Sequence, residues 1–61
     1  MKIVCVDNYG RETRNDYLIA ENVNKTYGER IVKFLNKEEG EETPNFFKLV
    51  EDTYVLYKFE P

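Results

Sequence analysis

The chain contains one cysteine and no histidine, so two usual means of stabilising a very small protein are missing. Cys5 has no partner for a disulfide within the chain, and the common zinc-binding sets need more cysteines or histidines. A chain of 61 residues is near the lower size limit for independent folding. The core must therefore come from large side chains, and aromatic residues make up 15% of the sequence. Dimerisation is the other common way for a small chain to bury apolar surface, and the sequence leaves this alternative open.

Length and charge set the broad class of the protein. The length predicts a single domain over residues 1–61. A net charge of −3 argues against nucleic-acid binding, which depends on Lys and Arg neutralising phosphates. The first residues lack the apolar core of a signal peptide, and no apolar run approaches the roughly 20 residues of a membrane span. With the lone cysteine, these features predict a cytoplasmic protein without membrane contact.

Two strands are predicted in the first third of the chain. The stretch "KIVCV" (residues 2–6) is apolar on both faces and β-branched, which is typical of a central strand. "DNYG" (residues 7–10) favours a turn, with Asp7 as its capping residue and Gly10 supplying a positive φ. "YLIAENV" (residues 17–23) fits a second, antiparallel strand or an early start of the helix. Both readings of residues 17–23 stay open, with strand preferred.

A helix is predicted within residues 24–40. Four apolar residues at spacing i, i+4, i+7 and i+8 form a stripe that is expected to face the core: Tyr27, Ile31, Phe34 and Leu35. Its start is either an N-cap at Asn24 or a capping box of Thr26 and Glu29. Gly40 is the expected C-terminal end.

The last sixteen positions before Pro61 are rich in Phe and Tyr. "FFKLV" and "YVLYKF" flank Glu51-Asp52-Thr53, which predicts a β-hairpin. With a three-residue loop, one apolar face packs on the helix: Phe47, Leu49, Val55, Tyr57 and Phe59. A two-residue loop would exchange side chains between the two faces of the hairpin, so the sequence leaves the hairpin register open. The fold predicted overall is α+β, in the order β-β-α-β-β, with one helix packed on an antiparallel or mixed sheet.

The second face of this hairpin is the candidate binding site. It carries Phe46, Lys48, Val50, Tyr54, Leu56 and Lys58. An aromatic centre with a polar rim has the composition of an interface. The alternative is that Tyr17, Leu18 and the first strand cover this face within the monomer.

The inventory of catalytic groups is poor. The chain has neither histidine nor serine, and a thiol at Cys5 within an apolar strand would have a raised pKa. A carboxylate pair of Asp7 and Glu12 is conceivable, but so small a domain has little room for a pocket. We therefore expect no enzymatic activity, no cofactor and no metal site.

Three stretches, "VDNYGRE", "LIAENV…GERIVKFLN" and "YVLYKFEP", resemble those of small uncharacterised proteins from Gram-positive bacteria and their phages. The resemblance spans nearly the whole chain and implies a cytoplasmic or phage origin. It implies no activity and no functional residues.

The function expected from the sequence is that of a small interaction module of unknown biological role. It would bind a protein partner, or itself as a homodimer, through the second hairpin face. The alternative is a single-stranded nucleic-acid binder that stacks bases on the same aromatic residues.

Overall fold

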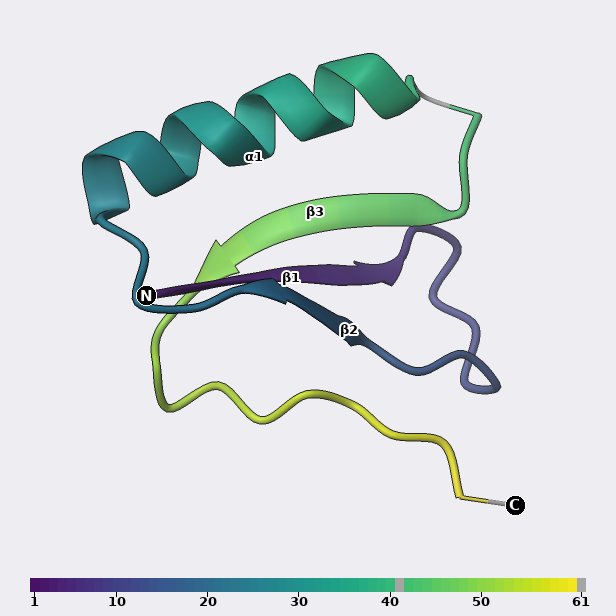
Figure 1. Cartoon of the computed structure of the whole chain (residues 1–61). Helices are drawn as coiled ribbons and strands as arrows, with labels where there is room; N and C mark the ends of the chain where they lie inside the picture. Colours follow the sequence, from purple (N-terminus) through teal and green to yellow (C-terminus); the bar gives the residue numbers. More distant parts are fainter. Residues whose placement is uncertain (41, 61) are drawn as a thin grey trace.

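The computed structural model describes residues 1–40 and 42–60, so Glu41 and Pro61 lie outside the described residues. The elements in chain order are β1 (Lys2–Asp7), β2 (Tyr17–Ala20), α1 (Lys25–Glu39) and β3 (Asn45–Val50). The three strands form one antiparallel sheet in the order β2-β1-β3 (Figure 1). The predicted α+β class, with one helix packed on an antiparallel sheet, is therefore confirmed.

The predicted central strand is also confirmed. β1 pairs with both neighbours, and Ile3 lies opposite Ala20 on one side and Leu49 on the other. Ile3 and Val4 point to opposite faces of the sheet, yet both are fully buried. Residues 17–20 form a strand rather than the start of the helix, with a register shift opposite Ile3 and Val4. The core is thus centred on β1 and is covered from both sides.

Local capping sets both ends of α1. Asn24 Oδ1 accepts hydrogen bonds from the backbone N–H groups of Thr26 at 2.8 Å and Tyr27 at 3.4 Å. Of the two starts that the sequence left open, the Asn24 cap is the one formed. At the other end Gly40 adopts a positive φ of 82° and donates its N–H to Asn36 O, as expected for a helix-ending glycine.

The predicted core stripe of the helix is wrong by about one residue. Gly28 is buried and Val32, Leu35 and Asn36 are half-buried, whereas Tyr27, Ile31 and Phe34 are exposed. The reason is a close approach of backbone to strand. A Cβ at Gly28 would lie 2.7 Å from Leu49 Cδ1 and 2.9 Å from Val23 Cγ1. The helix therefore packs on its glycine side.

Asn36 fixes α1 over the outer edge of β3. Its Nδ2 donates to Phe47 O at 2.9 Å, and its Oδ1 accepts from Phe47 N–H at 2.9 Å. Phe47 lies opposite Cys5 of β1, but its backbone groups turn away from β1 toward the helix. The amide of Asn36 thus takes the place that a neighbouring strand would occupy.

The predicted second strand of the hairpin is not formed. The described residues after Val50 contain no strand; Tyr54 N–H bonds to Glu51 O in a turn, and the chain then leaves β3. A hairpin partner would need the outer edge of β3, which α1 and Asn36 already cover. Consequently Val55 and Tyr57, predicted to face the helix, are 84% and 45% exposed, while Phe47 and Leu49 are placed as predicted.

The C-terminal segment, residues 51–60, lies across the sheet from α1 (Figure 1). Leu49 contacts the helix at Gly28, whereas the neighbouring Lys48 points to the other face and meets the ring of Tyr54. The molecule therefore has three layers: the helix, the sheet and an irregular segment.

Candidate interaction surfaces

The six residues proposed from the sequence do not form one open surface. Phe46 is 42% exposed and Lys58 is exposed, but four of them are half-buried: Lys48, Val50, Tyr54 and Leu56. Lys48 Nζ lies 5.0 Å from the centre of the Tyr54 ring, so the C-terminal segment folds back onto β3. One ring face that a nucleic-acid base would need for stacking is therefore already in contact with an ammonium group.

Asp16 holds the C-terminal segment in place. Its Oδ2 accepts hydrogen bonds from Tyr54 OH at 2.7 Å and from the backbone N–H of Tyr57 at 2.8 Å. Its own backbone N–H donates to Tyr57 O at 2.9 Å. The hydrogen bond to Asp16 raises the pKa of Tyr54, because the carboxylate favours the protonated phenol.

Two further contacts extend this attachment. Tyr57 OH donates to Glu12 O at 2.6 Å, and the N–H of Phe59 donates to Asn15 Oδ1 at 2.6 Å. No sequence pattern indicated this role, because residues 11–16 ("RETRND") have neither an apolar period nor a turn signature. The pairing of a polar loop with a distant aromatic segment is visible only in the folded chain.

A different apolar surface is exposed on α1. We call it the apolar helix stripe: Tyr27, Ile31 and Phe34, which are 62%, 44% and 60% exposed. Their spacing of four and three residues puts them on one side of the helix. Arg30 borders the stripe, with its guanidinium carbon 5.9 Å from the Tyr27 ring centre.

Of the stripe residues, Ile31 is the one turned toward the side of β1 and β2, whereas Tyr27 and Phe34 lie farther round the helix, toward solvent. Around the helix, at about 100° per residue, Asn36 and Ile31 lie on opposite sides of Val32. Asn36 turns to the outer edge of β3, so Ile31 turns the other way. α1 packs on β3 and β1. It makes no contact with β2, and all residues of α1 and β2 lie within the described ranges.

β2 adds an exposed aromatic side chain to the sheet face on which α1 packs. Tyr17 lies opposite Cys5, which lies opposite Phe47, so Tyr17 shares the sheet face on which α1 packs. Tyr17 is 56% exposed and Ile19, at the register shift, is 47% exposed. The sequence does contain a signal for this arrangement. The side of α1 that approaches the sheet most closely carries Gly28, Val32 and Asn36, which recur at a spacing of four residues.

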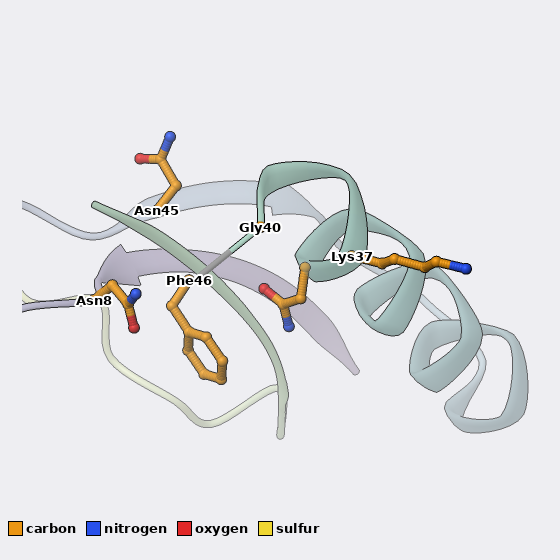
Figure 2. A pocket seen from close by; sticks show the side chains of 6 residues that line it. Asn8, Lys37, Gly40, Asn45 and Phe46 are labelled. Atoms are coloured by element: carbon orange, nitrogen blue, oxygen red, sulfur yellow. The ribbon is translucent and has the colours of Figure 1, made fainter. Parts of the chain in front are cut away.

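A pocket of about 550 Å³ lies between the end of α1 and the start of β3 (Figure 2). It is lined by Asn8, Asn36, Lys37, Gly40, Asn45 and Phe46. The three amides already serve the fold: besides the Asn36 pair, Asn8 Nδ2 donates to Thr43 O at 3.0 Å and Asn45 Nδ2 to Glu39 Oε1 at 3.4 Å. We assign these amides a structural role.

Asp7 borders a second, smaller pocket of about 240 Å³. Its carboxylate accepts from Arg11 Nε at 2.8 Å, Arg11 Nη2 at 3.0 Å and the Arg11 N–H at 2.8 Å. The hydrogen bonds from the Arg11 side chain contribute most, and together with the backbone bond they hold the pKa of Asp7 well below its usual range. Asp7 is thus the turn cap that the sequence predicted, and its partner is Arg11 rather than Glu12.

Cys5 is buried, with 5% of its surface exposed, as predicted for a small apolar residue. Its Sγ lies 3.8 Å from Asn45 Oδ1, and burial raises the pKa of the thiol. Such a thiol is poorly reactive.

Comparison of the chain with protein-family models, with curated proteins and with solved structures finds no match. The resemblance noted from the sequence stays a prediction. Within the described residues, no helix has the length and apolar character needed to cross a membrane.

Proposed function

We propose that this chain is a small protein-interaction module that binds a polypeptide through the apolar helix stripe, with the exposed Tyr17 on the same face of the sheet as α1. The observation that carries the proposal is the exposure of two aromatic rings and one isoleucine along one side of α1. Aromatic residues and arginine are enriched at binding hot spots, and Arg30 lies beside Tyr27.

Rigidity supports the stripe as the binding surface. α1 is capped at both ends and bonded to β3 through Asn36, so the three stripe residues are presented without further ordering of the backbone. By contrast, four of the six side chains of the surface proposed from the sequence are half-buried, two on β3 and two in the C-terminal segment that packs against it. We therefore propose the helix, rather than the hairpin predicted from the sequence, as the main binding surface of an interaction module.

Affinity capture with matched variants tests this function. The wild-type chain, Ile31→Arg and Val55→Arg are immobilised and exposed to a lysate that also contains untagged chain. Val55 is the control, because it is 84% exposed and lies on the C-terminal segment, away from α1. We expect wild type and Val55→Arg to retain the same proteins and Ile31→Arg to lose them. Identical capture by all three would contradict the proposal.

A further inference from the structure

We infer that the apolar helix stripe binds a second copy of this chain, with the two α1 helices antiparallel about a two-fold axis near Ile31. This inference rests on the proposed function and names its partner. Four observations carry it: the excess of exposed surface, the small core, the symmetry of the stripe and the charge at its end.

The chain exposes more surface than a compact monomer of its size. Its accessible surface is 4748 Å² at a mass of 7.3 kDa. Monomeric proteins of this mass expose about 4,200 Å². The excess of roughly 550 Å² is close to the share of one partner in a small specific interface, about 600–800 Å². The three exposed aromatic side chains Tyr17, Tyr27 and Phe34 account for about 350 Å² of it, taking about 200 Å² for each fully exposed aromatic side chain.

The core of the single chain is small. Among the described residues the buried hydrophobic side chains are Ile3, Val4, Cys5 and Phe47. Domains below about 70 residues commonly need a disulfide, a metal or a partner chain. Cys5 has no disulfide partner, and no cluster of metal-ligating side chains occurs among the described residues. A second copy is always available to the chain, whereas another partner must be supplied.

The stripe is self-complementary about its centre. Tyr27 precedes Ile31 by four residues and Phe34 follows it by three, or about 6 Å and 4.5 Å along the axis. In an antiparallel pair centred on Ile31, each Tyr27 ring therefore lies beside the Phe34 ring of the other copy. Such an interface is isologous and closes with two copies.

Charge favours the same orientation. Glu38 follows Phe34 by one turn on the same side of α1, and it is exposed. In the antiparallel pair it lies level with Asn24 of the other copy, at the positive end of that helix. The first turn of α1 contains no acidic residue of its own. The carboxylate of Glu38 therefore complements the helix dipole of the second copy.

Light scattering behind a sizing column, over a hundredfold concentration range, measures the assembly. We expect wild type to have twice the 7.3 kDa chain mass at the upper concentrations. We expect Ile31→Arg to be monomeric throughout, with an unchanged helical circular dichroism signal, and Val55→Arg to stay dimeric. Glu38→Gln should weaken dimerisation by about 3- to 30-fold, since two equivalent charge contacts are lost.

A cysteine cross-link tests the axis independently of these variants. Residues at a two-fold axis face their own copies, so Ile31→Cys should form an intermolecular disulfide on mild oxidation much faster than Val55→Cys. The native Cys5 is buried and is not expected to compete.

A wild-type monomer at all concentrations would overturn the inference, as would a dimer that survives Ile31→Arg or cross-links equally well at residue 55. If the wild type is a monomer that still captures other proteins through Ile31, the inference of a second copy is wrong and the proposed function stands. A monomer without stripe-dependent capture would overturn both.

Discussion

At the scale of single residues, Gly28 decides which side of α1 is buried. The apolar spacing of Tyr27, Ile31 and Phe34 alone would turn the helix by about one residue relative to the sheet. The missing side chain at Gly28 lets Leu49 and Val23 approach the helix backbone instead. One glycine therefore leaves three large apolar side chains exposed.

Gly28→Val should lower the free energy of unfolding by about 2 kcal/mol, because the added atoms overlap packed side chains. Urea unfolding followed by circular dichroism measures the change. Lys33→Val is the matched control, since it places the same residue at an exposed position of α1. A loss at Gly28→Val no larger than that at Lys33→Val would contradict tight packing at Gly28, because valine has a higher helix propensity than glycine.

The ionisation of Asp7 is linked to the stability of the fold. Its carboxylate is bonded to Arg11, and its pKa is held well below the usual range. A depressed pKa in the folded state means that Asp7 stabilises the fold above its unfolded pKa of about 3.9. That contribution is lost as pH falls from there toward the folded pKa.

We therefore expect Asp7→Asn to be less stable than wild type at pH 6, with the difference shrinking below pH about 4. Thermal unfolding from pH 6 to pH 2 provides the measurement. Glu21→Gln, at an exposed position, is the control and should show no such convergence. A constant difference across this range would mean that the Asp7 charge is not what stabilises the turn.

At the scale of elements, the fold is decided by how the free edge of β3 is used. The side chain of Asn36 bonds both backbone groups of Phe47, which leaves no place for a hairpin strand. An edge strand with open backbone groups also favours aggregation. Asn36 thus joins helix to sheet and protects the edge.

Asn36→Ala should cost about 1–3 kcal/mol, because two partly buried backbone groups lose their partners. Urea unfolding measures this loss, and turbidity on standing reports association through the open edge. Lys37→Ala, at the exposed neighbouring position, should change neither quantity. Equal stability of Asn36→Ala and wild type would show that water replaces the amide without cost.

The C-terminal segment is held by side chains rather than by a strand ladder. Asp16→Ala removes the acceptor for Tyr54 OH and the Tyr57 N–H, and we expect a loss of about 2 kcal/mol. Hydrogen exchange of the amides at Tyr57 and Phe59 should accelerate more than that of β1. Glu51→Ala, at an exposed position at the start of the segment, is the control. Unchanged exchange at Tyr57 would mean that apolar contacts suffice to hold the segment.

At the scale of the whole molecule, the chain forms a flat body, with extents of 36 × 28 × 12 Å. So flat a shape buries few side chains completely, and the surface area is correspondingly large. A second copy on the apolar helix stripe would add the missing burial to the side of the sheet that α1 leaves open.

The thermal midpoint should then rise with protein concentration, because dimerisation stabilises the folded state by mass action. Differential scanning calorimetry over a hundredfold concentration range measures this dependence. Ile31→Arg should show a lower midpoint that does not depend on concentration. A wild-type midpoint that is constant over the range would contradict dimerisation at these concentrations.

Most of the elements were predictable because their signals are local. The β-branched run of β1, the cap at Asn24, the glycine at the helix end and the Asp7 turn each depend on residues a few positions apart. The class of fold followed from their order. The C-terminal strand was predicted from equally local signals and does not form, because its partner edge is covered by a residue eleven positions before Phe47.

The sequence by itself thus determined the β1 strand, the C-terminal end of the helix and the absence of an intrachain disulfide, all of which depend on neighbouring residues or on composition. Only the tertiary structure decided which helix side is buried, where the C-terminal segment lies and which apolar surface stays exposed. These outcomes depend on competition between distant segments for one strand edge and on the close approach at Gly28, and neither has a local pattern.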